Sequence, residues 1–184
     1  MLFRSDSDTQ ITAVAPARVA GTVDATVTSP GGTSSTSGTG NDVTYWAAPT
    51  VTSLTPVSGP VAGGQSVVIA GTGFQSVTAV AFGGTPATSF TVNSTTSITA
   101  VTPAGVAGPV DVSVTAVGGT SANTSADDYT YFGVPTVTGL SASNGPSSGG
   151  TTVVITGTNL LGATAVKFGT TNAATFTVDS NTQI

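Results

Sequence analysis

Apolar residues alternate with small or polar residues in short runs along the middle of the chain. These runs contain Val67 and Ile69, Val80 and Phe82, Phe90 and Val92, Val110, Val112 and Val114, and Tyr129 and Tyr131. Neighbouring side chains of a β-strand point to opposite faces, so each run predicts a strand with one face in a core and the other in water. The pattern therefore predicts an all-β fold.

Glycine pairs separate these predicted strands, at Gly63-Gly64, Gly83-Gly84 and Gly118-Gly119. Glycine reaches positive φ at little cost and closes tight hairpins, so each pair is interpreted as a turn. A phosphate-binding loop is the alternative interpretation, but none of the pairs opens a predicted helix or is followed by lysine. About seven short strands with turns between them are typical of a two-sheet, immunoglobulin-like β-sandwich.

The chain repeats itself in two overlapping matches. Val134 to Thr138 (VPTVT) matches Ala48 to Thr52 (APTVT), an offset of 86 residues, and this match runs on without a gap through Phe168, which matches Phe82. Thr9 to Pro16 (TQITAVAP) matches Thr96 to Pro103 (TSITAVTP), an offset of 87 residues. Self-similarity over such lengths indicates tandem modules.

The repeat predicts the domain boundaries. Residues 6–46 are the C-terminal part of one module, residues 47–132 are a complete module, and residues 133–184 are the N-terminal part of a third. Residues 1–5 have no counterpart in these matches and are expected to be a non-native leader.

The two partial modules supply complementary sets of strands. We therefore expect either head-to-tail association of chains or disordered ends around a folded central module, because an incomplete sandwich exposes unpaired strand edges.

Charged residues are scarce and mostly acidic. They make up 6% of the 184 residues, with a net charge of -5, and the acidic residues are all aspartate. The three basic residues, Arg4, Arg18 and Lys167, are too few and too scattered to neutralise a run of phosphates, which argues against a nucleic-acid partner. No apolar stretch approaches the roughly 20 residues that a membrane-spanning helix needs, so no membrane insertion is expected.

The residue types that usually carry catalysis are missing. The chain contains no Cys, His or Glu. A thiol nucleophile, a thiolate metal site and a Ser-His-Asp arrangement are therefore excluded, and the scattered aspartates form no paired-carboxylate pattern. We predict that the chain is not an enzyme, has no catalytic or cofactor-binding residues, and needs no cofactor.

The ordered series of short motifs resembles the IPT/TIG family of immunoglobulin-like domains. The series includes Pro49-Thr50-Val51, Gly59-Pro60, Gly63-Gly64, Val67-Val68-Ile69, Gly71-Thr72-Gly73-Phe74, Val80-Ala81-Phe82-Gly83-Gly84, Thr102-Pro103 and Tyr129-Thr130-Tyr131, and much of it recurs in the third module. The resemblance implies non-catalytic work. Such domains occur in receptors such as plexins, in transcription factors, beside starch-acting catalytic domains and in long bacterial surface proteins. The low charge of this chain is most similar to that of the bacterial surface proteins.

Asp127-Asp128 invites interpretation as a calcium site, because calcium prefers several carboxylate and carbonyl oxygens, and Asn41-Asp42 lies at the matching place in the first module. The spacing of a known calcium loop is missing, however, and adjacent strand residues point to opposite faces. A solvated start of a strand is the preferred interpretation, and no metal site is predicted. Lys167, between Val166 and Phe168, is interpreted as a solvated side chain on the outer face of its strand.

Trp46 and Phe132 occupy equivalent positions at the end of a module and are predicted to point towards the following one. They could bind sugar, but buttressing the joint between modules is the preferred interpretation. The linkers Ala47-Ala48 and Gly133-Val134 are too short for flexible tethers, which favours a semi-rigid rod. Asn93-Ser94-Thr95 and Asn123-Thr124-Ser125 match the glycosylation pattern but are interpreted as loop markers.

These observations predict a structural or adhesive repeat of a larger cell-surface or secreted protein, acting as a spacer and interaction surface outside the cell. The alternative is an accessory, carbohydrate-binding module of a secreted polysaccharide-active enzyme. The expected partners are neighbouring repeats of the same protein, with a protein or glycan ligand of unknown identity.

Overall fold

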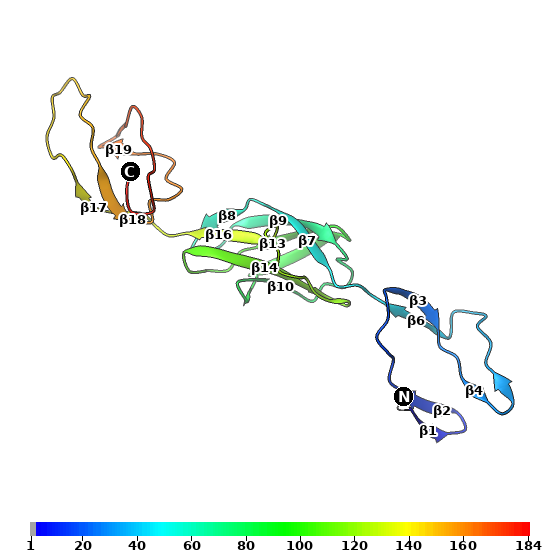
Figure 1. Ribbon diagram of the computed structural model, residues 1–184. Helices are drawn as coiled ribbons and strands as arrows, with labels where there is room; N and C mark the ends of the chain where they lie inside the picture. Colours follow the sequence, from blue (N-terminus) through cyan, green and yellow to red (C-terminus); the bar gives the residue numbers. More distant parts are fainter. Residues whose placement is uncertain (1–2) are drawn as a thin grey trace.

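The computed structural model describes residues 3–184, and the exposure of side chains from Ser7 onward. Strands, turns and loops make up this range, and three parts follow one another along an extended molecule (Figure 1). An N-terminal part lies on one side of a central body and a C-terminal part on the other. The all-β prediction is confirmed. Within residues 3–184, no helix has the length and apolar character to cross a bilayer.

The central body consists of two sheets. A four-stranded sheet has the order β12 (Ser89–Ser94), β13 (Ser97–Val101), β9 (Ser66–Thr72) and β7 (Thr50–Thr55). A six-stranded sheet has the order β11 (Thr85–Pro86), β10 (Ala79–Phe82), β14 (Gly108–Ala116), β16 (Asp128–Phe132) and β8 (Ser58–Pro60), and β15 (Gly119–Thr120) also pairs with β14. Strands β8 and β16 are parallel, and the other pairs are antiparallel.

The core of the central body lies between these two sheets. Its buried residues lie on the inward face of each strand, together with Phe74 from the β9–β10 connection: Val51, Leu54, Val67, Ile69, Phe74, Val80, Phe82, Ile98, Ala100, Val112, Val114, Tyr129 and Tyr131. Val51 and Leu54 are both buried although they are three positions apart, because a register shift between Val51 and Ser53 interrupts the alternation of β7. Burying each large aliphatic side chain contributes roughly 1.5 to 3 kcal/mol to folding. Phe90 and Val92 are less buried than the others, because β12 is at the edge of its sheet.

The N-terminal part contains three two-stranded pairs: β1 (Phe3–Ser7) with β2 (Gln10–Ala13), β3 (Gly21–Asp24) with β6 (Asp42–Tyr45), and β4 (Thr28–Ser29) with β5 (Gly32–Thr33). Their registers follow the central body. Val23 lies opposite Val43, as Val110 lies opposite Tyr129.

The hairpin of β1 and β2 includes residues 3–5, which belong to the leader that the sequence predicts at residues 1–5. Phe3 lies opposite Ala13 in this hairpin, as Phe90 lies opposite Ala100 in the hairpin of β12 and β13. The backbone of residues 3–5 thus takes a place that the repeat provides. Met1 and Leu2 lie outside the described residues, and the non-native origin of the leader stays a prediction.

The C-terminal part contains two pairs, β17 (Thr136–Leu140) with β18 (Ile155–Thr158) and β19 (Lys167–Phe168) with β20 (Thr171–Asn172). Leu140 lies opposite Ile155, as Leu54 lies opposite Ile69, and Phe168 lies opposite Thr171, as Phe82 lies opposite Thr85. The same sequence pattern therefore gives the same local pairing, with fewer strands to build on.

Candidate functional site

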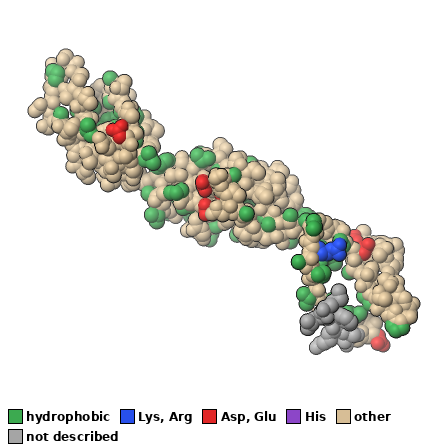
Figure 2. All heavy atoms as spheres, in the orientation of Figure 1, with side chains coloured by type: hydrophobic (Ala, Val, Ile, Leu, Met, Phe, Trp, Pro, Cys, Tyr) green, Lys and Arg blue, Asp and Glu red, His purple; other side chains and the backbone are tan. Residues whose placement is uncertain are grey.

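Three aspartates of the central body come together where β14 and β16 pair. Asp111 and Asp128 lie opposite each other in the two strands, and Asp127 immediately precedes β16. A carboxylate oxygen from each residue lies within 4.8 Å of one from each of the others. Acidic side chains are visible on the exposed face of the central body, among mostly uncharged atoms (Figure 2).

Hydrogen bonds hold two of these carboxylates in place. Asp127 Oδ1 accepts a hydrogen bond from the backbone N–H of Thr124, at 3.0 Å, which closes the turn before β16. Asn123 Nδ2 donates to Asp111 Oδ2. Asp127 is 1% exposed, and Asp111 and Asp128 are exposed. The arrangement thus joins one buried and two solvated carboxylates.

The preferred interpretation of Asp127 as a solvated residue is wrong. Asp127 precedes the strand, which begins at Asp128, so the alternation of a strand does not apply to this pair. The turn carries the Asp127 side chain inward, and its buried carboxylate bonds the Thr124 amide instead of water. Its counterpart in the N-terminal part is Asn41, whose Nδ2 donates to Asp24 Oδ1 at 3.2 Å.

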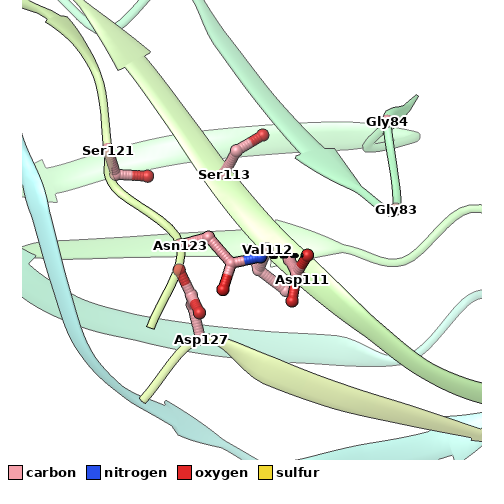
Figure 3. A pocket seen from close by; sticks show the side chains of 8 residues that line it. All are labelled: Gly83, Gly84, Asp111, Val112, Ser113, Ser121, Asn123 and Asp127. Carbon is pink, nitrogen blue, oxygen red and sulfur yellow. Dashed lines mark hydrogen bonds between the residues drawn. The ribbon is translucent and has the colours of Figure 1, made fainter. Parts of the chain in front are cut away.

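A pocket of about 230 Å³ adjoins the acidic cluster, lined by Gly83, Gly84, Asp111, Val112, Ser113, Ser121, Asn123 and Asp127 (Figure 3). The Asn123 amide stands between the Asp111 and Asp127 side chains, where it donates to Asp111. Oxygens of this kind suit a hard cation such as calcium in chemical type. The hydrogen bonds of the turn already account for the position of Asp127, however, so the geometry has a structural explanation without an ion.

The joint between the central body and the C-terminal part is built from direct contacts. The ring of Phe132 lies against Gly162, where a Cβ would be 3.2 Å from ring carbons. Asn159 Nδ2 donates to the carbonyl oxygen of Val134 at 3.1 Å. Asn159 and Gly162 both have positive φ, 55° and 84°. Phe132 therefore faces the following part, as the joint interpretation expects.

Trp46, at the equivalent joint, is 47% exposed. The linker behind it contacts the turn between β14 and β15, because a Cβ on Gly118 would be 3.0 Å from the carbonyl carbon of Trp46. A half-exposed indole can stack on a sugar ring as well as on a protein neighbour. Lys167 is exposed on β19, and so is its neighbour Phe168, so exposure alone does not assign Lys167 to one face of the strand.

The two asparagines of the glycosylation patterns are engaged in hydrogen bonds. Asn93 Nδ2, on β12, donates to Thr99 Oγ1 at 2.8 Å, and Asn123 donates to Asp111. The interpretation of the first pattern as a loop marker is wrong for Asn93, which lies in β12, whereas Asn123 lies in a loop as expected.

The model of the IPT/TIG domain family matches residues 49–131 and 135–184. No curated protein is significantly similar to the chain. Among solved structures, the full extracellular region of plexin A4 is 25% identical, with a TM-score of 0.45, over 80% of this chain and 12% of that one. SGBP-B from a xyloglucan utilization locus in Bacteroides uniformis is 16% identical, with a TM-score of 0.40, over 72% of this chain and 41% of that one. The chain thus spans less than half the length of either structure.

Proposed function

The chain belongs to the IPT/TIG domain family, and we propose that it serves without catalysis as a semi-rigid spacer that presents an interaction surface in a larger cell-surface or secreted protein. The joint at Phe132 and Asn159 carries this proposal. A spacer must hold one module at a fixed angle to the next. A short linker limits the distance between two modules, but side-chain contacts at the joint are needed to fix the angle.

Two further observations support a non-catalytic role. The core of the central body consists of apolar side chains and two tyrosines, and its one acidic cluster is tied to backbone and amide donors. The chain has no His, Cys or Glu to act as a general base or nucleophile. The purified chain should therefore show no hydrolysis on panels of polysaccharides, peptides and esters. Turnover that survives repurification and is lost on mutation of one aspartate would contradict the proposal.

The experiment that tests the spacer is a distance measurement between spin labels. The chain has no cysteine, so labels placed at Thr85→Cys and Ser147→Cys report only the distance between the central body and the C-terminal part. A narrow distance distribution is expected, and Asn159→Gly should broaden it, because glycine keeps the positive φ but cannot bond Val134. Asn144→Gly, an exposed asparagine outside the joint, is the matched control. A broad distribution in the unmodified sequence would refute a semi-rigid spacer.

The half-exposed Trp46 favours one second candidate, a carbohydrate-binding accessory module of a polysaccharide-active enzyme. An exposed aromatic face binds sugar rings by stacking. Trp46 is the single tryptophan, so its fluorescence reports this site alone. Titration with a panel of soluble polysaccharides should shift its emission if this function holds, and Trp46→Ala should abolish binding. No change in emission and no retention in affinity gels would remove the candidate.

A further inference from the structure

Strand β12 leaves one long edge of the central body uncovered. Among the described strands, β12 pairs only with β13. The central body has both sheets of the sandwich, its strands run along its length, and the N-terminal and C-terminal parts adjoin its two ends (Figure 1). The free edge of β12 therefore lies on the flank of the central body, and its exposure does not arise from where the chain begins or ends.

The other edge strands of the central body carry features that hinder pairing with a further strand. Strand β7 has a register shift between Val51 and Ser53, β8 has three residues and ends at Pro60, and β11 and β15 have two residues each. Strand β12 has six residues and no proline, and its pairing with β13 is regular from Ser89 to Val92. This edge is thus the one best suited to accept another strand.

The sheet that contains β12 carries no charge. The chain has no charged residue between Asp42 and Asp111, a range that includes all four strands of this sheet. The six-stranded sheet, in contrast, carries the exposed Asp111 and Asp128. A second copy has the same net charge of -5, and like charges placed opposite each other destabilise a pair of strands. The edge of β12 is therefore a place where two copies can meet without this repulsion.

The inward face of β12 is incompletely covered. Phe90 lies opposite Ala100, and Val92 lies opposite Ile98. Ala100 and Ile98 are fully buried, whereas Phe90 is only partly buried against the core and Val92 is 39% exposed. A strand added beside β12 would remove both side chains from water, which favours association.

The outward face of β12 presents a threonine without a partner. Threonines that lie opposite each other are bonded elsewhere in the molecule, as Thr50 and Thr72 are at 2.8 Å. Thr91 lies opposite Thr99, but the Thr99 hydroxyl accepts a hydrogen bond from Asn93 Nδ2 at 2.8 Å instead. Within residues 3–184, the Thr91 hydroxyl has no hydrogen-bond partner. It is therefore available to a strand on its other side.

We propose that two copies of this chain associate side by side through β12. The two β12 strands pair antiparallel about a twofold axis at Thr91, so that the two Thr91 side chains face each other. Each Phe90 then lies opposite Val92 of the other copy. Hydroxyl meets hydroxyl on the outward face and aromatic meets β-branched on the inward face, and cross-strand pairs of both kinds stabilise sheets. The pairing also supplies partners for the free backbone groups of both edges.

The apolar residues of β12 select this register. Directly opposite residues of antiparallel strands point to the same side, so the axis must pass through a residue that keeps both inward faces together. An axis at Phe90 would set Val92 opposite Thr88 of the other copy, and an axis at Val92 would set Phe90 opposite Ser94. Only the axis at Thr91 covers Phe90 and Val92 with each other. The same surface is used by both copies, so the contact closes as a dimer.

Cysteine cross-linking tests the register, because the chain has no cysteine of its own. In the proposed pair, the two residues 91 have Cα atoms about 5 Å apart, and the two residues 89 are roughly 14 Å apart. Mild oxidation with diamide should therefore link Thr91→Cys into a dimer but leave Ser89→Cys, on the same face of the same strand, unlinked. Ser53→Cys, exposed on the edge strand β7, is a second control. Absence of the Thr91→Cys dimer, or equal cross-linking of all three variants, would overturn the proposal.

Sedimentation across about a hundredfold concentration range tests the association itself. The unmodified chain should show an equilibrium between monomer and dimer, with new protection from hydrogen exchange at residues 89–93. Val92→Lys places a charge on the inward face of the edge and should weaken dimerisation at least about tenfold. Val68→Lys, on the outward face of the same sheet, should leave it unchanged and is a matched control, because Val68 is 44% exposed. Circular dichroism establishes that both variants fold.

A strict monomer over the whole concentration range would overturn the proposal. Association that Val92→Lys leaves unchanged, or that the two lysine variants weaken equally, would also overturn it, because another surface would then be responsible. The inference rests on the proposed function only in that it identifies the interaction surface of the spacer. The spin-label distance lies within one chain, whereas the disulfide joins two chains. A broad distance distribution with an intact disulfide dimer would thus refute the semi-rigid spacer alone, and the reverse result would refute the side-by-side contact alone.

Discussion

Tyr129 and Tyr131 lie edge to face in the core of the central body, with ring centroids 5.1 Å apart and an interplanar angle of 75°. Both are buried side chains of β16, yet their hydroxyl groups differ. Tyr131 Oη donates to the carbonyl oxygen of Pro103 at 2.9 Å, whereas Tyr129 Oη has no hydrogen-bond partner of normal geometry among the described residues. The pair therefore places a satisfied and an unsatisfied phenol next to each other.

Removing the two hydroxyl groups should have opposite consequences. Tyr131→Phe leaves the buried Pro103 carbonyl without its donor and should lower the free energy of unfolding by about 1 to 3 kcal/mol. Tyr129→Phe removes an unpartnered buried hydroxyl and should leave stability unchanged or raise it slightly. Urea unfolding of the two variants measures the difference in stability, provided that the free energy of unfolding falls with urea concentration at the same slope in both. A larger loss for Tyr129→Phe would show that its hydroxyl has a partner in solution.

The two tyrosines should also make stability fall at alkaline pH. Burial raises the pKa of Tyr129 and of Tyr131 above 10.0, the neighbouring Tyr131 raises that of Tyr129 further, and the Thr102 side chain opposes both shifts. The unfolded chain thus loses these protons at lower pH than the folded chain does. The stabilisation is complete below pH about 10 and is lost as pH rises above it.

Absorbance at 295 nm during an alkaline titration checks this prediction. Ionisation of Tyr129 and Tyr131 should coincide with the unfolding seen by circular dichroism. The variant with both tyrosines replaced by Phe should lose most of the pH dependence above 10. Ionisation that is complete while the fold persists would contradict the burial argument.

Two adjacent glycines of the turn before β9 should respond differently to alanine. Gly63 and Gly64 have φ of 73° and 80°, so either substitution strains the backbone by roughly 1 to 2 kcal/mol. A Cβ on Gly63 would also lie 2.7 Å from the backbone nitrogen of Ala104, whereas a Cβ on Gly64 meets no atom within 4 Å. Gly63→Ala should therefore cost about 1 to 3 kcal/mol more than Gly64→Ala in thermal or urea unfolding. Equal losses of unfolding free energy in the two variants would show that the Pro103–Ala104 segment shifts to make room for the added methyl group.

The buried Asp127 should act as an acceptor for the turn and not as a required charge. Asp127→Ala removes the partner of the Thr124 amide and should destabilise the central body by about 1 to 3 kcal/mol. Asp127→Asn keeps an acceptor oxygen and should cost less, as the asparagine at the equivalent position 41 suggests. Asp128→Ala, on the exposed neighbour, should change stability by no more than about 0.5 kcal/mol. The melting temperature of the unmodified chain, measured at increasing calcium concentration, shows whether a bound ion stabilises the central body further.

The strands were predictable from the sequence because their signal is local. Alternation places Val67, Ile69, Val112 and Val114 on buried faces, and the glycine pairs mark turns. The neighbours of each strand were not predictable in this way, because pairing across a sheet depends on contacts distant in sequence. The parallel pair of β8 and β16 joins Ser58 to Thr130, and no pattern within either strand indicates the other.

The candidate site was predictable only in part. The sequence draws attention to Asp127 and Asp128, but the third carboxylate, Asp111, reaches them only through the β14–β16 register. Strand alternation misplaces the Asp127 side chain, because it treats this residue as part of β16, whereas the strand begins at Asp128. The repeat does contain a signal for this role, because Asn41 occupies the position that matches Asp127. Aspartate and asparagine side chains both offer an oxygen that can accept a hydrogen bond from a turn amide.

Paired threonine hydroxyls recur in all three parts of the molecule, where Thr22 bonds Thr44 at 2.9 Å, Thr50 bonds Thr72 at 2.8 Å and Thr136 bonds Thr158 at 2.7 Å. Each pair crosses between neighbouring strands on a solvent-facing side. Mobile ions weaken attractions between exposed charges but leave neutral hydroxyl pairs almost untouched. These three contacts between strands should therefore hold as well in concentrated salt as in dilute buffer, which ion pairs at the same positions would not do.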